Sequence, residues 1–328
     1  MRSLQALAAS AALGLAAGCA GAGTVSAAPE PSPATSVTVY GNAAMGDAAP
    51  ARIIVGARTG LHFPSAVAID AHGNRYVANR ADNSVTVYGS SARGNAAPLR
   101  TIAGVRTGLD LPTGLALDAR GNVYVANRSG NTVTVYASAA GGNAAPIRTL
   151  RGSLTHLDGP TSIALDAHQN VYVTNLAGRS VTTFAPGAGG DVAPVRIIRG
   201  NRTRLTAAFA ITVDRGGTVY VVNSDDNGVE GVLVFAPGVH GNVAPARIIA
   251  GSAAKLETAS GVAVDARGSI FVSDHGGSGG PGAIRVFAKD ADGNTAPLYS
   301  IAGSATRLRP YGITIDRSGT INVVNQAE

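Results

Sequence analysis

The sequence contains no tryptophan and a single cysteine, Cys19. Aromatic residues make up 5% of its 328 residues and charged residues 14%, where about a quarter is usual for charge. One cysteine excludes a disulfide scaffold and a zinc-ribbon protein, because each needs several cysteines. Hydrophobic residues make up 45%, which excludes a chain that is disordered throughout, because such chains are rich in charge and poor in apolar residues.

Lysine is almost absent as well. Lys255 and Lys289 are the only lysines among 26 basic residues, and the formal net charge is +6. A nucleic-acid-binding surface would gather basic residues together with stacking aromatic residues. Here the arginines recur at a regular interval along the chain, so we expect no nucleic-acid partner.

Residues 1–27 are predicted to be a signal peptide. Arg2 supplies a minimal positive start, and an apolar stretch runs from Leu4 to Gly18. This stretch is short for a membrane span and lies at the beginning of the chain, which favours an export signal. We therefore expect an exported protein of the cell envelope, either anchored there or secreted.

The segment 15–19, which reads LAAGC, resembles the lipobox of bacterial lipoproteins. The resemblance implies that Cys19 is lipid-modified and becomes the first residue of the mature chain, although Ala16 stands where leucine is usual. The alternative is ordinary cleavage near Ala27, after the sequence Val25-Ser26-Ala27. Residues 28–36 are rich in small residues and proline and would form a flexible tether. A lipid on Cys19 would be the only contact with a membrane.

Residues 37–328 are predicted to be six copies of one unit. An aspartate marks each copy, at intervals of 48 or 51 residues: Asp70, Asp118, Asp166, Asp214, Asp265 and Asp316. Within the second copy, apolar and polar residues alternate with a period of two, which indicates short strands at 114–118, 123–127, 132–136 and 147–150. Four short antiparallel strands in each repeat of this length are typical of a β-propeller blade.

The repeated pattern P-x-G-[IL]-A-[IVL]-D-x-x-G-N-x-Y-V-x-N resembles the NHL repeat over residues 37–325. That family forms six-bladed propellers, so the resemblance implies an all-β chain of six four-stranded antiparallel blades. Residues 37–40 and 52–55 are of third- and fourth-strand type, whereas 312–316 and 320–325 are of first- and second-strand type. We therefore expect the sixth blade to be closed by two strands from each terminus, which leaves no open ring edge.

Arginine recurs at one position of the predicted fourth strand, which would be the outer edge of each blade. A charged side chain there would discourage pairing between the edges of different molecules. A structural role is likewise expected for the asparagines that end the second strands, because asparagine commonly braces turns. These asparagines are Asn79, Asn127, Asn175, Asn223 and Asn325, with Asp274 in the fifth unit.

Propeller ligands usually bind on the face that carries the loops from strand 4 to strand 1 and from strand 2 to strand 3. The 2→3 loop differs among the copies: Tyr124 and Tyr136 are 12 residues apart, but Tyr220 and Phe235 are 15 apart and Phe271 and Phe287 are 16 apart. Such departures from a repeat are where function tends to lie.

The two longer loops carry acidic side chains that could bind a divalent cation such as Ca²⁺, and the alternative is a solvated polar loop. The candidate ligands are Asp225, Asp226, Glu230 and Asp274. Three histidines, His62, His156 and His275, map to the same ligand face. They would hold Zn²⁺ only if they converge, and otherwise are unrelated surface residues.

These observations favour an exported propeller that acts as a binding or scaffolding module for a protein or small-molecule ligand. The alternative is a metal-dependent enzyme that resembles the lactonase or streptogramin-lyase propellers. We do not find their motif sets, because no glutamate is close to His275 in the sequence and none is expected at the mouth of a first strand. We therefore assign no catalytic residue.

Overall fold

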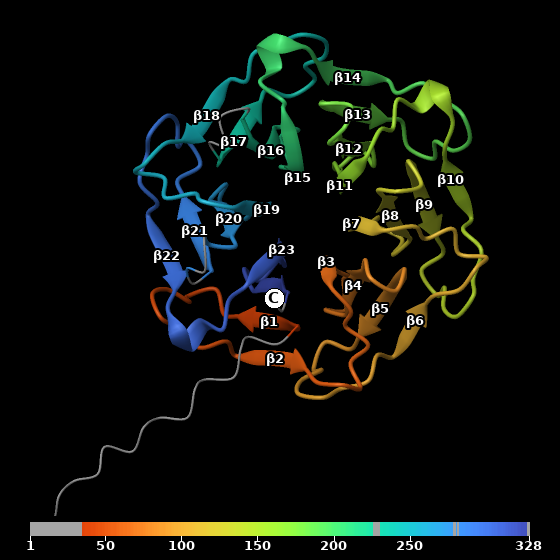
Figure 1. Ribbon diagram of the computed structural model, residues 1–328, viewed down its shortest axis with the longest axis horizontal. Coiled ribbons are helices and arrows are strands. Elements are labelled where there is room, and N and C mark those ends of the chain that lie inside the picture. The colour runs from red at the N-terminus through yellow and green to blue at the C-terminus, as the bar shows by residue number, and fades with distance from the viewer. Residues whose placement is uncertain (1–34, 226–229, 278–279, 281, 327–328) are drawn as a thin grey trace, which may run out of the picture. The chain divides into compact units, whose positions relative to one another are not determined.

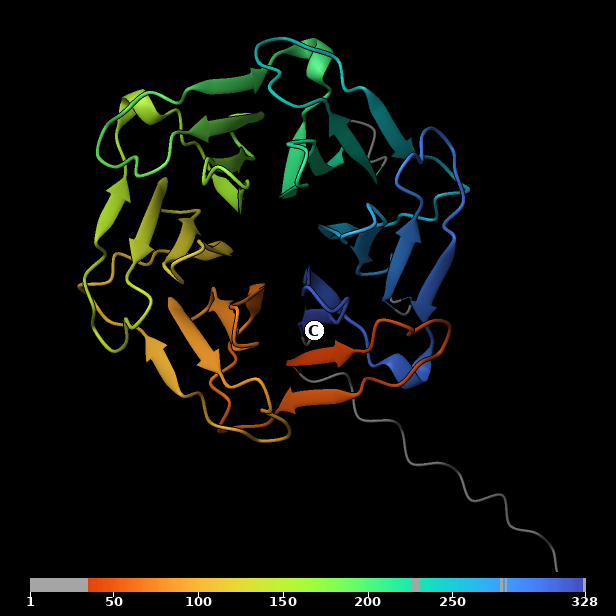
Figure 2. The same cartoon turned by 180° about the vertical axis from the view of Figure 1, so that it is seen from behind.

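The computed structural model describes residues 35–225, 230–277, 280 and 282–326. These residues form strands and three short 3₁₀ turns, and no helix among them is long and apolar enough to cross a membrane. The strands make six four-stranded antiparallel sheets around a central axis (Figures 1 and 2). The predicted all-β, six-bladed propeller is confirmed.

In each blade the first strand lies innermost and the fourth outermost (Figure 1). Blade one is β3 (Pro64–Ile69), β4 (Arg75–Asn79), β5 (Ser84–Tyr88) and β6 (Arg100–Ile102), and blade two is β7 (Pro112–Leu117), β8 (Val123–Asn127), β9 (Thr132–Tyr136) and β10 (Arg148–Leu150). Blade three is β11 (Pro160–Leu165), β12 (Val171–Asn175), β13 (Ser180–Phe184) and β14 (Arg196–Arg199), and blade four is β15 (Ala207–Val213), β16 (Val219–Ser224), β17 (Glu230–Phe235) and β18 (Arg247–Ala250). Blade five is β19 (Ala259–Val264), β20 (Ile270–Asp274), β21 (Ala283–Phe287) and β22 (Tyr299–Ala302), and blade six is β23 (Pro310–Ile315), β24 (Ile321–Asn325), β1 (Ser36–Tyr40) and β2 (Arg52–Val55).

Blade six closes the ring as predicted from the two ends of the repeat region. Strand β1 pairs with β24 on one side and with β2 on the other, with Val37 opposite both Val324 and Ile54. Asn325 donates a hydrogen bond from its Nδ2 to Thr38 Oγ1 at 3.0 Å, across the same junction. Antiparallel pairing of the two ends of this domain thus completes the last blade.

The core lies between blades. The second and third strands are buried on both faces, because each blade is covered by a neighbour on either side. The third strand of each blade ends in a fully buried aromatic ring: Tyr40, Tyr88, Tyr136, Phe184, Phe235 and Phe287. The alternation that predicts a third strand therefore does not mark a solvent-exposed face, and buried threonines such as Thr134 are hydrogen-bonded instead.

Neighbouring blades interlock at the outer edge. Gly94, in the 3→4 loop of blade one, donates its N–H to Ile53 O at 2.6 Å and accepts the N–H of Val55 at 3.0 Å. Its neighbour Asn95 accepts the N–H of Arg58 through Oδ1 at 2.7 Å. The same parallel bridge recurs at every blade boundary, through Gly46, Gly94, Gly142, Gly190, Gly241 and Gly293. Part of each outer strand edge is thus paired within the protein.

The recurring arginines also join blades. Arg100 donates one hydrogen bond to the hydroxyl of Tyr76 at 2.8 Å and another to Ser138 O, which belongs to the next blade. Arg52 reaches Ser90 O of the next blade at 2.7 Å in the same way. Edge protection was the role expected from the sequence, and the structure adds a hydrogen-bonded link between neighbouring blades.

Candidate ligand site at the mouth of the central channel

A cavity of about 420 Å³ lies on the axis of the propeller and is lined by residues from all six first strands. One position in these strands always holds a small residue: Ala66, Gly114, Ser162, Ala210, Gly261 and Gly312. A Cβ atom at Gly114 would lie 2.7 Å from Ser162 Cα. Neighbouring first strands thus approach too closely for a larger side chain, and this close approach limits the width of the channel.

Two charged side chains line the cavity in the described structure, those of Arg128 and Glu230. Arg128 follows β8, and Glu230 begins β17, so both belong to 2→3 connections. Antiparallel pairing brings these connections to the same end of each blade as the 4→1 loops, as the pairing of Pro64 with Asn79 in blade one shows. The charged groups of the channel are therefore concentrated at one mouth.

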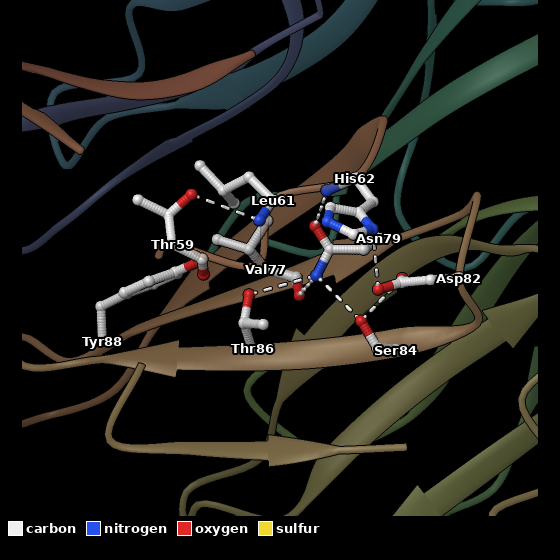
Figure 3. A network of polar contacts seen from close by, with 9 residues as sticks. All are labelled: Thr59, Leu61, His62, Val77, Asn79, Asp82, Ser84, Thr86 and Tyr88. Carbon is white, nitrogen blue, oxygen red and sulfur yellow. Dashed lines mark hydrogen bonds and ion pairs between the residues drawn. The ribbon is translucent and has the colours of Figure 1, made fainter. Parts of the chain in front are cut away.

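The asparagines that end the second strands hold the loops of this mouth in place, and their side chains are buried. Figure 3 shows that Asn79 accepts the backbone N–H of His62 through Oδ1 at 3.1 Å and donates from Nδ2 to Thr86 Oγ1 at 3.1 Å. Asn79 has no exposed surface. Its amide therefore ties the 4→1 loop to the third strand, which is the structural role expected from the sequence.

Apart from His275, the residue after each of these positions was not singled out in the sequence, yet it lies at the mouth. Its backbone is held in the same way in most blades, as when the N–H groups of Arg80 and Arg128 bond to Phe63 O and Leu111 O. Its side chain differs in nearly every blade: Arg80, Arg128, Leu176, Ser224, His275 and Gln326. A variable residue directly after a repeated asparagine was the signal that could have identified this ring of side chains.

Arg80 is fixed by its neighbours from blade six. Its guanidinium lies 5.1 Å from the ring centre of Tyr311 and 5.8 Å from that of Phe63, within the range of cation–π contacts. It donates to Gln326 Oε1 at 3.0 Å, and Gln326 in turn donates to Pro64 O at 2.9 Å. Arg80 is therefore part of the junction that closes the ring.

Arg128 occupies the same position one blade further on, but its surroundings differ. In the repeat, the places of Tyr311 and Gln326 are taken by Ser65 and Arg80, which supply neither an aromatic face nor an acceptor amide. The side chain of Arg128 is exposed, and its guanidinium makes no hydrogen bond or ion pair with the part of the chain that the structure describes. It is therefore open to an anionic group of a ligand.

Hydrogen bonds tie neighbouring blades together at this mouth. At four of the six boundaries a first-strand hydroxyl donates to the next blade, as Ser65 does to Pro112 O at 2.8 Å and Thr161 to Ala208 O at 2.7 Å. Phe209 and Tyr311 replace this hydroxyl in blades four and six. At the boundary between blades four and five, the Glu230 carboxyl lies near the backbone N–H of Ala259.

The pKa of the Glu230 carboxyl is raised, chiefly by burial. The negative charges of Asp274 and Asp225 raise this pKa further, whereas hydrogen bonding by Ser224 and the Ala259 N–H lowers it. Its Oε2 atom is buried and has no hydrogen-bond partner among the described residues.

The expectation that no glutamate lies at the mouth of a first strand was wrong. Glu230 pairs with Ser224 in a strand extended by the longer loop, and this places it beside the first strand of blade five.

Asp274 is fully buried in place of the asparagine found in the other blades. Its carboxylate accepts the N–H of Thr258 at 2.9 Å and lies 3.2 Å from Arg285 Nε. Asp226 lies outside the described residues, and the described ones contain no group of three or more His, Cys, Asp or Glu side chains that could hold a metal. The calcium site stays a prediction.

The three histidines predicted at the ligand face lie on loops at this face, but their surroundings differ. The His62 Nδ1 atom lies 3.3 Å from Asp82 Oδ2, and its side chain is 56% exposed. His156 is exposed at the end of the 3₁₀ turn Ser153–Thr155. His275 bonds through its backbone N–H to Thr258 O, and its Nδ1 is buried without a partner in the described structure. None of the three lines the cavity.

Comparison with known proteins agrees with this architecture. A family model described as lactonase, 7-bladed beta-propeller, matches residues 34–143, about a third of the chain, whereas the structure has six blades. No curated protein sequence matches.

Solved structures show the same fold at low sequence identity. An inactive variant of virginiamycin B lyase from Staphylococcus aureus with quinupristin matches at TM-score 0.56 and 12% identity, over 84% of both chains. A streptogramin B lyase matches at 0.53 and 11%, over 88% of this chain and 98% of the other. Kuenenia stuttgartiensis hydrazine synthase matches at 0.55 and 14%, over 83% and 98%. At these identities the likeness establishes a propeller fold, which is the conclusion that the comparisons support for this chain.

Proposed function

We propose that this protein is an exported β-propeller that binds a small molecule at the mouth of its central channel. The observation that carries this proposal is the position of Arg128 and Glu230, the charged side chains among the described residues that line the cavity, at the mouth with the irregular loops. A volume of about 420 Å³, with a wall of aliphatic side chains interspersed with polar groups, is within the range of small-molecule sites.

The proposed location in the cell envelope rests on the N-terminal sequence. Residues 1–27 would be a signal peptide and residues 28–36 a tether. With a lipid on Cys19, an NHL-like propeller of residues 37–328 would be held at the membrane and would present its channel to the cell envelope. Replacing Cys19 with alanine should then release the protein from the membrane fraction or block its maturation. An unlabelled mature chain that begins at Ala28, after metabolic labelling with a palmitate analogue, would establish the secreted form instead.

The binding site can be tested with a small-molecule library observed by ligand NMR. Hits that bind the channel should weaken at least tenfold in Arg128→Ala and in Phe209→Ala, because both side chains line the cavity. Arg120→Ala is the matched control, because Arg120 is an exposed arginine in the 1→2 turn of the same blade, on the opposite face. Hits that bind all variants equally would place the ligand elsewhere, and a chain with no hits would favour a scaffold for a protein partner.

A second candidate function is catalysis by a lactonase-like or lyase-like propeller. The observation that favours it is Glu230, whose raised pKa and unpartnered Oε2 suit a group that exchanges a proton with a substrate. A panel of lactones and cyclic depsipeptides tests it, with and without divalent cations. Turnover that is lost in Glu230→Gln would support the enzyme, and the same turnover in both proteins would exclude Glu230 from the reaction.

A further inference from the structure

We propose that the ligand is bipolar: its anionic group binds Arg128, its ammonium group binds Glu230, and an apolar segment joins the two across the channel. Amino carboxylates, including short peptides, have this chemistry. This inference rests on the proposed function, because it specifies the ligand class of that same mouth.

The cationic side of the site is Arg128. Arg80 on the neighbouring blade is held by Phe63, Tyr311 and Gln326, so its charge remains near the mouth while its guanidinium is fixed in place. Arg128 adds a second positive charge one blade further on and has no such partners among the described residues. Two arginines that form no ion pair within the described part of the chain favour an anion, and a planar guanidinium can bind a carboxylate through two parallel hydrogen bonds.

The anionic side is Glu230. Blade four lies two blades beyond blade two around the ring, so Glu230 faces the channel from a different sector than Arg128 (Figure 1). The carboxyl group of Glu230 lies near the N–H of Ala259, and its Oε2 atom is buried without a donor within the described part of the chain. A carboxylate group that lines the cavity can accept charge-assisted hydrogen bonds from an ammonium group of a ligand.

Two threonine hydroxyls of the wall between the two charges are already hydrogen-bonded within the protein. Thr113 on blade two and Thr161 on blade three use their hydroxyls to bond Pro160 O at 3.0 Å and Ala208 O at 2.7 Å. Phe209 follows where a third hydroxyl would stand. The remaining lining of these strands is mostly aliphatic, with Leu115, Ile163 and Ile211 among it. The side chains of this wall therefore favour an apolar segment between the charged ends of a ligand.

The test uses unbranched ω-amino carboxylates with four to ten carbons, titrated calorimetrically into the purified propeller. One chain length should bind best, because its charge separation matches that of Arg128 and Glu230. The carboxylic acid and the amine of the same length should bind at least tenfold more weakly, because each leaves one charge of the protein without its partner. The screen for any channel ligand, described above, is run on the same preparation.

Variants assign each end of the ligand. In Arg128→Gln the amino carboxylate should bind no better than the amine, whereas in Glu230→Gln it should bind no better than the carboxylic acid. Arg120→Gln and Glu257→Gln are the controls and should keep the preference of the natural protein. Each variant is first shown to unfold cooperatively near the natural melting temperature, so that lost binding reports on the site.

The inference is overturned if no chain length binds, if the singly charged compounds bind as tightly, or if the preference persists in both variants. The proposed function survives any of these results when the library yields other ligands that depend on Arg128. Both fail together only if the channel binds nothing in either experiment.

Discussion

Asp274 Oδ2 and Arg285 Nε lie 3.2 Å apart, where four of the other blades pair an asparagine with a threonine. Asp274 has no exposed surface, and a carboxylate there is tolerated only with a cation beside it. Both members of the pair have therefore changed together in blade five. This substitution places a buried ion pair beneath the loop that carries His275.

The pair predicts a strongly non-additive mutant cycle. Arg285→Thr alone leaves a buried negative charge and should cost about 3–5 kcal/mol of unfolding free energy, and Asp274→Asn alone should also destabilise. The double variant restores the arrangement of blade one and should unfold within about 1 kcal/mol of the natural protein. Urea denaturation measures all four proteins. Additive losses would mean that the two residues act independently.

Glu230 predicts a pH dependence with a definite sign. Its pKa is raised in the folded protein, so its contribution to stability is complete below the ordinary carboxyl pKa and is lost as the pH rises through the raised value. Glu230→Gln avoids this loss, so the variant should gain stability relative to the natural protein between pH 4 and pH 7. Urea midpoints at both pH values measure the gain. Glu257→Gln, at an exposed glutamate, is the control, and an equal effect of Glu230→Gln at both pH values would contradict the prediction.

Ring closure predicts that residues 35–55 are indispensable. A chain that starts at residue 35 should unfold cooperatively, whereas one that starts at residue 56 lacks β1 and β2 and leaves the edge of β24 unpaired. The loss includes several fully buried side chains, each worth about 1.5–3 kcal/mol, against a usual total of about 5–15 kcal/mol. Thermal unfolding compares the two chains, and a peptide of residues 35–55 should rescue the shorter one. Equal melting curves without the peptide would show that blade six is dispensable.

The acidic loops of blades four and five predict a response to metal. If Asp225, Asp226 and Glu230, with or without Asp274, bind a divalent cation, the cation should stabilise the fold by about 2.7 kcal/mol at a hundredfold excess over its dissociation constant. Melting curves with Ca²⁺, Mg²⁺ or Zn²⁺ measure this. The rise should vanish when Asp225 and Asp226 are both changed to asparagine. No rise, or an equal rise in both proteins, would identify an ordinary solvated loop.

The residues that repeat were interpreted correctly from the sequence, because their environment repeats as well. The asparagine at position 79 and its equivalents recur at fixed spacing, and so do the residues that end the strands. The same repeated strand types identified the four strands of the closing blade. The residues of the candidate site do not recur, so the repeat pattern carried no information about their neighbours. Glu230 was singled out as a metal ligand, but its place beside Ala259 of the next blade could not be deduced, and Arg128 was not singled out at all.

The sequence by itself determined the six-bladed propeller, its four-stranded blades and the origin of the sixth blade from both ends of residues 37–328, because a period of two and a 48-residue repeat are local patterns. Only the tertiary structure decided which of two equivalent arginines is engaged. Arg80 meets Tyr311 and Gln326 because ring closure brings the last blade against the first, whereas Arg128 meets an ordinary neighbour. Contacts across blades depend on the packing of distant segments, and within the described structure this packing leaves the cation of Arg128 and the carboxyl group of Glu230 at the channel.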